Sequence, residues 1–316
     1  MPLEKSLETP LLFLVFNRHE PTARVFERIR AMRPATLYVS ADGPRAGRDG
    51  EYDACRKVRE IVKNVDWDCD TKYLFHDSNL GCKKGVSTGI TWFFENEAEG
   101  IVLEDDCLPD PSFFQFCSEL LTRYRDDGRI GLIAGTNYLG ESECEDDYFF
   151  SRHCPIWGWA SWRRAWSRYD LAMRDWPEFK RRGFLQVSFA DEGIRQFFSS
   201  IYENVADNKI DTWDHQWSFT CRRENWLTAI PKRNLVTNIG FSTDATHTKD
   251  AANPLADRVS YTLDTAALRH PRVILPDPGL EQATSHYILS IMGMKTDAPS
   301  QKNVIRRVKD WIRALR

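Results

Sequence analysis

The sequence predicts an α/β protein in which a mostly parallel sheet is flanked by helices and continued by a C-terminal elaboration. Through the first 140 residues, short apolar runs alternate with amphipathic segments, as in a doubly wound sheet. The apolar runs contain no polar alternation, which is typical of strands that are buried on both faces. Each run ends in polar or charged residues, and the carboxyl ends of parallel strands are where such sheets bind ligands.

Apolar patterning, prolines and capping residues define the elements of this part in order. Proline favours the first turn of a helix and interrupts a helix that reaches it, so Pro21 and Pro34 bracket the first helix. Asp110 and Pro111 likewise cap and start a later helix. The expected elements are strand 11–16, helix 21–33, strand 36–40, helix 51–64, strand 72–75, helix 81–96, strand 101–103, a long helix after Pro111, and strand 130–134.

Beyond about residue 140 the alternation ends, and the chain becomes acidic and then rich in aromatic residues. We expect helices near 191–206 and 214–224, and short strands at 226–230 and 235–239. We therefore divide the chain into residues 1–140, 141–250 and 251–316. The first two are halves of one domain, and the third is a C-terminal extension.

The composition is that of an ordinary globular protein and excludes several classes. A net charge of −3 does not indicate the excess of positive charge that is typical of nucleic-acid-binding proteins. The first apolar run is too short for a signal sequence, and no run approaches a membrane span. The eight cysteines form no Cys-x-x-Cys pair, which argues against zinc and favours the cytoplasm. The eleven tryptophans lie mostly after residue 156 and indicate either a ring-stacking site or core.

Three adjacent carboxylates, Glu104, Asp105 and Asp106, follow the strand at 101–103. Like charges repel and are costly at the edge of an apolar interior unless a positive group lies among them. Carboxylate oxygens suit Mn²⁺ or Mg²⁺, either of which would bridge to phosphate groups. The alternative is a solvated acidic loop, but the position at the end of a buried strand favours a metal site.

Polar residues at the other strand ends suit a nucleotide. Asp42 could accept a hydrogen bond from a base, and Arg18, Arg45 or Lys83 could neutralise phosphate. No glycine-rich phosphate loop follows the first strand, which disfavours the dinucleotide-binding and Walker motifs. His247, in a polar stretch, could contact a diphosphate or a metal, or simply lie at the surface.

Taken together, residues 10–247 resemble the inverting GT-A glycosyltransferases of the N-acetylglucosaminyltransferase I type and their bacterial relatives. The motifs that carry the resemblance are the acidic triplet followed by Pro109-Asp110-Pro111, the segment Trp157-Gly158-Trp159, and the segment Trp213-Asp214-His215-Gln216-Trp217. The last segment has one more residue between its Asp and its final Trp than the family has. The family's first-strand cysteine is Asn17 here.

The resemblance implies a role for each matching residue. Asp106 would be the metal ligand, and Glu104 and Asp105 would contact sugar and ribose hydroxyls. Arg18 matches the arginine after the first strand, and Asp42 matches the acid that reads uracil. Trp157, Gly158 and Trp159 would lie near the transferred sugar, and Asp214 would be the catalytic base.

The sequence thus predicts a cytoplasmic, metal-dependent inverting glycosyltransferase, specifically a hexosyl- or N-acetylhexosaminyltransferase. It would move a sugar, GlcNAc-like in the related family, from a UDP-sugar donor to a hydroxyl of a glycan or lipid-linked acceptor. Residues 1–140 would hold the donor, and residues 141–250 would face the acceptor. The alternatives are a sugar-phosphate nucleotidyltransferase and a non-catalytic sugar- or nucleotide-binding protein.

The C-terminal segment 302–316 has an amphipathic helical pattern with basic residues and one tryptophan. Two interpretations remain open for it. The segment docks its apolar side on the catalytic domain, or it lies on the anionic inner membrane, where the acceptor would be found.

Overall fold

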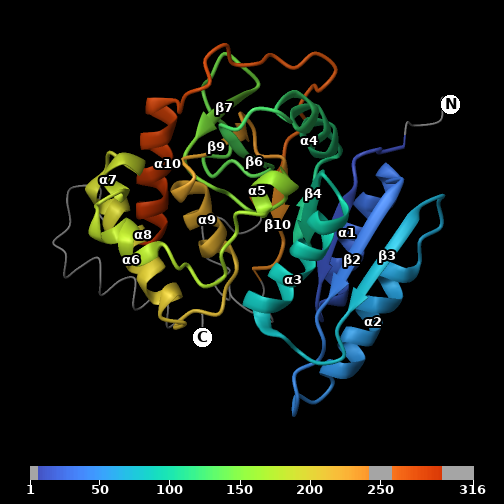
Figure 1. Ribbon diagram of the computed structural model, residues 1–316. Coiled ribbons are helices and arrows are strands. Elements are labelled where there is room, and N and C mark those ends of the chain that lie inside the picture. Colours follow the sequence, from blue (N-terminus) through green and yellow to red (C-terminus); the bar gives the residue numbers. More distant parts are fainter. Residues whose placement is uncertain (1–5, 242–257, 294–316) are drawn as a thin grey trace.

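The computed structural model describes residues 6–241 and 258–293 of the 316-residue chain (Figure 1). His247 and the amphipathic segment 302–316 lie outside these residues, so their predicted roles remain predictions. Across the described ranges, we find no helix that combines the length and the apolar character needed to cross a membrane.

The elements of the first part have the predicted order, except that a short strand at Cys107–Pro109 was not predicted, and further short elements follow in the second part. The strands are β1 (Leu11–Val15), β2 (Thr36–Ala41), β3 (Asp70–Phe75), β4 (Glu99–Glu104), β5 (Cys107–Pro109), β6 (Ile130–Ala134), β7 (Tyr148–Ser151), β8 (Trp159–Trp162), β9 (Leu227–Pro231) and β10 (Val236–Asn238). The helices are α1 (His19–Met32), α2 (Glu51–Lys63), α3 (Gly81–Asn96), α4 (Pro111–Arg123), α5 (Arg163–Trp166), α6 (Trp176–Arg181), α7 (Leu185–Ser188), α8 (Glu192–Ala206), α9 (Asp214–Arg223) and α10 (Pro278–Ile291).

The described residues form one eight-stranded sheet with the strand order β3-β2-β1-β4-β8-β6-β9-β7. Strands β3, β2, β1 and β4 are mutually parallel, β6 and β9 run the same way, and β8 and β7 are antiparallel to their neighbours. This confirms the predicted α/β class with a mostly parallel sheet. The strand order reverses between β1 and β4, so a ligand crevice is expected at the carboxyl ends of these two strands.

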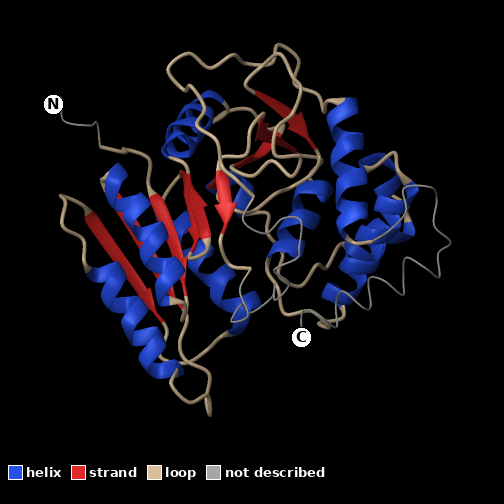
Figure 2. Ribbon diagram, turned by 180° about the vertical axis from the view of Figure 1, so that it is seen from behind, coloured by secondary structure: helices blue, strands red, loops and turns tan. Residues whose placement is uncertain are grey.

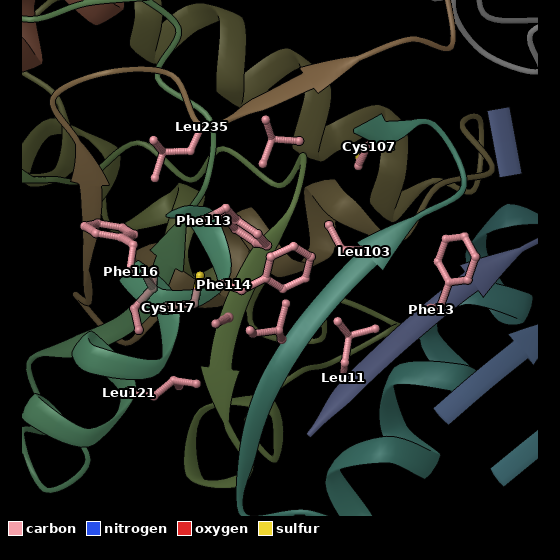
Figure 3. Close-up of a cluster of buried hydrophobic side chains, with 14 of the residues drawn as sticks. Leu11, Phe13, Leu103, Cys107, Phe113, Phe114, Phe116, Cys117, Leu121 and Leu235 are labelled. Carbon is pink, nitrogen blue, oxygen red and sulfur yellow. The ribbon is translucent and has the colours of Figure 1, made fainter. Parts of the chain in front are cut away.

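Helices cover both faces of the sheet, as the two opposite views show (Figures 1 and 2). Leu11 and Phe13 of β1 face the core beneath α1, α2 and α4, whereas Leu12 and Leu14 face the core beneath α3, α5 and α9. This alternation explains why the strand sequence contains no polar residue. In Figure 3, Phe113 and Phe114 of α4 lie beside Leu103 of β4, and burial of each such side chain contributes about 1.5–3 kcal/mol.

The tryptophan-rich segment contains a central strand that the sequence analysis did not assign. Strand β8 is inserted between β4 and β6, so the second part of the chain completes the sheet of the first. Its Trp159 faces one core, and its Ala160 and Trp162 face the other. Because β8 is buried on both faces, Trp159 and Trp162 are core side chains, one on each face of the sheet.

A third apolar cluster joins α6, α7, α8, α9 and α10 on the far side of the sheet. Helices α8 and α9 confirm the predictions near 191–206 and 214–224. Helix α10 was not predicted, although Asp277 followed by Pro278 is a helix-start signal; the Asp277 side chain accepts a hydrogen bond from the Leu280 backbone N–H. Through α10, the C-terminal extension becomes part of the wall of the site described below.

Candidate functional site

A cavity of about 900 Å³ opens at the carboxyl ends of β1, β2 and β4 and reaches across to α8, α9 and α10. Its size is within the range of cofactor and substrate pockets. It brings together residues from both parts of the chain. Those used below are Phe16, Arg18, Asp42, Arg45, Glu104, Asp105, Asp106, Tyr138, His153, Trp157, Phe197, Phe198, Ile210, Asp211, Asp214, Ser218, Gly240, Phe241, Ile288, Ile291 and Met292.

Arg18 lies between two of the three adjacent carboxylates. It occupies the three-residue turn between β1 and α1, and the strand pairing of β1 with β4 places that turn beside Asp105 and Asp106. Its Nη2 donates to Oδ1 of Asp105 and lies 3.0 Å from Oδ2 of Asp106. Burial alone would lower the pKa of Arg18, but the charges of Asp105 and Asp106 outweigh it and raise the pKa above its usual value. The arginine is therefore the positive group that allows like charges to sit together.

The backbone of Gly240 closes the other side of this cluster. The chain reaches it from β10, which pairs with β5, and the Ile239 N–H donates to the Asp106 carbonyl at 2.8 Å. A Cβ at Gly240 would lie 2.1 Å from Oδ2 of Asp106 and 2.9 Å from Nη1 of Arg18. Only glycine lets the backbone approach the Arg18–Asp106 pair this closely.

Replacement of Gly240 by Ala should therefore separate Arg18 from Asp106 or displace the loop after β10. We expect a loss of about 1–3 kcal/mol in the free energy of unfolding, measured by urea denaturation, as for overpacking elsewhere. Gly128→Ala is the matched control, because a Cβ there meets nothing within 4 Å. If the two variants had the same free energy of unfolding, the loop at Gly240 would accommodate a Cβ without loss of stability, which would contradict this prediction.

The carboxylates suit a divalent cation that is completed by ligand phosphates. Among the described residues, Oδ2 of Asp105 is buried without a hydrogen-bond partner, and Oδ1 of Asp106 accepts from the Cys107 thiol, at 3.6 Å. In the described ranges, no group of three or more His, Cys, Asp or Glu side chains forms a cage by itself. Mg²⁺-type sites commonly use one or two carboxylates together with substrate phosphates, so the donor set fits such an ion.

Glu104 and Asp214 face the same cavity from opposite parts of the chain. Burial raises the pKa of Glu104 well above its usual value, and the charges of Asp106, Asp105 and Asp214 add to this. Asp214 is the first residue of α9, where its Oδ1 accepts hydrogen bonds from the Thr212 hydroxyl and from the His215 N–H. The described residues leave Oδ2 of Asp214 without a donor, so this oxygen can receive a proton from a ligand.

Asp42 lines the cavity, but its carboxylate is already saturated. Its Oδ1 accepts from the backbone N–H groups of Gly43 and Leu80, and its Oδ2 accepts from the Asn79 amide and the Gly81 N–H, at 2.8–3.2 Å. A carboxylate has about four acceptor positions, so these four bonds occupy them. Asp42 thus stabilises the turn into α3. To accept a hydrogen bond from a nucleotide base, its carboxylate would have to lose at least one of these four bonds.

The two other predicted phosphate-binding residues differ in position. Arg45 lines the cavity, but its guanidinium pairs with Glu51 and lies 5.4 Å from the Phe16 ring centroid. Lys83 is not part of the cavity wall, and its Nζ donates to Oδ1 of Asn208 at 2.8 Å. Of the three predicted phosphate-binding residues, only Arg18 lies among the acidic residues of the cavity.

The three residues of the Trp-Gly-Trp segment have three different environments. Trp157 lines the cavity, where its ring packs edge-on against Tyr138 and Phe241. Gly158 has a φ of +65°, and a Cβ there would lie 2.8 Å from Val236. Trp159 has no exposed surface and packs against other core tryptophans, so the predicted place for it beside a sugar is wrong in this structure. Only the first ring is available to a ligand.

Tyr138, His153 and α10 were not predicted as cavity residues, because no local pattern marks them, whereas Asp211 is, from the sequence, an alternative candidate for the base. Asp211 lines the cavity and accepts hydrogen bonds from the Cys82 and Lys83 N–H groups at the start of α3. Tyr138, His153 and the end of α10 reach the cavity only through the folding of distant segments. The helix-start signal at Asp277 could have revealed α10, but not which wall it forms.

Comparison with known proteins assigns no family to the chain. No family model and no curated protein matches the sequence. Similar solved structures include the mannosyltransferase PcManGT from Pyrobaculum calidifontis in complex with GDP-Man and Mn²⁺, with 12% identity over 97% of this chain and 75% of that chain and a TM-score of 0.42. They also include 4-diphosphocytidyl-2C-methyl-D-erythritol synthase from Anaerococcus prevotii, with 6% identity over 70% of this chain and 88% of that chain and a TM-score of 0.35.

HddC from Yersinia pseudotuberculosis is similar at 10% identity over 40% of this chain, with a TM-score of 0.27, and the match spans 56% of the length of HddC. With identities of 12% or less and TM-scores below 0.5, none of these three likenesses identifies an activity. The resemblance to the N-acetylglucosaminyltransferase I type therefore stays a prediction.

Proposed function

We propose that this protein is a metal-dependent inverting glycosyltransferase that uses a UDP-sugar donor and a hydroxyl acceptor. The observation that carries the proposal is the convergence, in one cavity, of Arg18 with Glu104, Asp105 and Asp106 on one side and Asp214 on the other. The first group suits a diphosphate with its cation, and the second suits an acceptor hydroxyl. We place the reaction in the cytoplasm, as the cysteine pattern indicates.

On the donor side, the chain supplies charge and orientation. Asp106, with Asp105 beside it, would hold Mn²⁺ or Mg²⁺, and the ion when bound would neutralise charge on the departing UDP. Arg18 remains paired with Asp105 and keeps the acidic cluster together while the donor enters. Glu104, whose pKa is raised by burial, is suited to donate a hydrogen bond to a sugar oxygen. Trp157 offers a ring for the apolar face of a sugar.

On the acceptor side, Asp214 provides the base that a single displacement requires. An acceptor hydroxyl within hydrogen-bond reach of its Oδ2 would lose its proton there as the hydroxyl oxygen attacks the anomeric carbon. Because Oδ1 is held by Thr212 and His215, the orientation of the carboxylate is set before the acceptor binds. A direct attack from the face opposite the leaving UDP inverts the anomeric centre.

A nucleotidyltransferase is disfavoured by the first turn of the sheet. The segment between β1 and α1 has three residues and no glycine, so it offers little backbone N–H surface to a triphosphate. The two activities release different products. A nucleotidyltransferase would form pyrophosphate from a nucleoside triphosphate and a sugar phosphate, whereas the proposed transferase releases UDP from a UDP-sugar.

The decisive experiment is a thermal-shift screen of UDP-, GDP- and ADP-sugars with and without Mn²⁺. A ligand present at about 100 times its Kd stabilises the native state by about 2.7 kcal/mol, so a rise in Tm is expected for a UDP-sugar only when the metal is present. Removal of the metal with EDTA should abolish the rise. A UDP-sugar that raises Tm equally in EDTA would contradict the metal-dependent site, and pyrophosphate release would establish the alternative activity.

A further inference from the structure

We propose that the end of the cavity between α8 and α10 is the acceptor subsite, and that it takes a glycoside whose far end is an uncharged apolar group. The inference rests on the proposed function, because it assigns the acceptor side of the same cavity. It goes beyond that function by naming the chemical class of the acceptor.

The wall at this end of the cavity is apolar, in contrast to the strand ends. Helix α8, the turn before α9 and the end of α10 contribute Phe197, Phe198, Ile210, Ile288, Ile291 and Met292. Arg18 and Arg45 are the basic residues among the described lining, and both lie on the opposite, strand side. Arg222 lies behind this wall, 4.6 Å from the Phe198 ring centroid and only 5% exposed, and is not part of the cavity lining. Among the described residues, an anionic group at the α8–α10 end would therefore have no cationic partner at the cavity surface and would be costly to desolvate. The wall favours an uncharged apolar group.

Helix α9 connects this apolar end to the proposed base. Residues four apart lie on one face of a helix, so Asp214, Ser218 and Arg222 form one row along α9. At 1.5 Å per residue, Ser218 lies about 6 Å and Arg222 about 12 Å along the axis from Asp214. The Arg222 guanidinium lies 4.6 Å from the Phe198 ring centroid, so the row ends at the apolar wall. An acceptor whose hydroxyl lies at Asp214 would thus extend past Ser218, which also lines the cavity, toward the apolar wall that includes Phe198.

His153 supplies a polar group within this apolar surrounding. It is 1% exposed and lines the cavity, and its Nε2 lies 3.0 Å from the Ser285 hydroxyl of α10. Its Nδ1 is buried and has no hydrogen-bond partner among the described residues. Burial, with the Arg222 charge, lowers the pKa of His153 to about 3, so the imidazole is neutral at physiological pH. A mainly apolar pocket with a few placed polar groups is the usual form of a small-molecule site.

The first test compares methyl, hexyl and carboxylate-bearing hexyl glucosides as probes, below their micelle concentrations. Binding to the full chain is followed by tryptophan fluorescence, since Trp157 lies in the cavity wall. Hexyl glucoside should bind at least about tenfold more tightly than methyl glucoside, because its additional methylenes enter an apolar lobe. The hexyl probe with a terminal carboxylate should lose that advantage. Equal affinity for methyl and hexyl glucoside, or equal affinity for the charged and uncharged hexyl probes, would overturn the proposal.

Ile291→Asn is the informative variant, because Ile291 is half-buried at the end of α10 and an amide there should not prevent folding. We expect it to lose most of the preference for the hexyl probe. Val187→Asn, at a residue that is 73% exposed, is the matched control and should keep that preference. Equal hexyl affinity in both variants would overturn the assignment of this wall.

The failure of this inference can be told apart from the failure of the proposed function. The Mn²⁺-dependent Tm shift with a UDP-sugar reports only the strand-end side of the cavity and should persist in Ile291→Asn. Loss of hexyl selectivity with a retained UDP-sugar shift supports the acceptor subsite. A wild-type protein with the UDP-sugar shift but no hexyl preference would overturn the subsite alone.

Discussion

Asp214→Asn should lower turnover by about 10²- to 10⁴-fold while changing the affinity for the donor little, because it removes basicity and keeps the size of the side chain. The asparagine oxygen can still accept the hydrogen bonds that Oδ1 of Asp214 receives from Thr212 and His215, so the start of α9 should remain intact. The measurement is UDP release from a UDP-sugar with an acceptor, together with the Kd of the donor in the absence of acceptor.

Asp191→Asn is the matched control for this change. Asp191 also begins a helix, α8, where its side chain accepts a hydrogen bond from the Ile194 N–H, and asparagine caps helices as well as aspartate does. It lies outside the cavity lining, so turnover should remain within about twofold of the wild type. If the Asp214 variant turned over normally, the base would lie elsewhere, and Asp211 in the same wall would be tested next.

Asp106→Ala should raise the Kd for Mn²⁺ in the presence of UDP by at least about 100-fold. Changes to residues that merely support metal ligands cost 10- to 100-fold, so removal of a ligand should cost more. The fold should persist, because Arg18 keeps its bond to Asp105 and the Asp106 backbone carbonyl still accepts from Ile239. Titration of Mn²⁺ by calorimetry, with UDP present, measures the effect directly and needs no acceptor.

Asp126→Ala, which removes an exposed acid in the turn after α4, controls for the change in net charge and should leave the Kd for Mn²⁺ unchanged. A retained Mn²⁺ affinity in Asp106→Ala, with the fold intact by circular dichroism, would remove this residue from the metal site. Asp105, whose Oδ2 is buried and has no partner in the part of the chain that the structure describes, would then be the remaining candidate ligand.

Much of the strand-end chemistry could be predicted from the sequence because it is local. An apolar run with no polar alternation is typical of a strand buried on both faces, so the amino-acid pattern alone is enough to recognise β1 and the apolar part of β4 as strands. In a parallel sheet, their carboxyl ends meet at one edge. The sequence therefore indicated that Arg18, Asp42 and the carboxylates 104–106 would line a common cavity.

Whether a polar side chain is free to bind a ligand is decided by the tertiary structure, because groups from distant segments of the chain can occupy the same hydrogen-bonding positions. The sequence cannot say whether the Asp42 carboxylate is free, because its four donors come from its neighbour Gly43 and from residues 79–81 after β3. The same holds for Arg45, which pairs with Glu51, and for Lys83, which bonds Asn208. Arg45 and Lys83 have the right charge for phosphate, and Asp42 has the right acceptors for a base, but partners within the fold already occupy all three side chains.

The tryptophans show the same limit for apolar residues. An indole ring suits a sugar face and a sheet core equally well, and the insertion of β8 between β4 and β6 is what assigns Trp159 to the core and leaves Trp157 in the cavity. By itself, the sequence determined the α/β class, the alternation of elements and the acidic strand end, because these depend on local periodicity and charge. Only the tertiary structure decided which polar atoms remain unpaired, that Gly240 closes over Asp106, and that α10 forms the far wall, because these depend on contacts between segments distant in the chain.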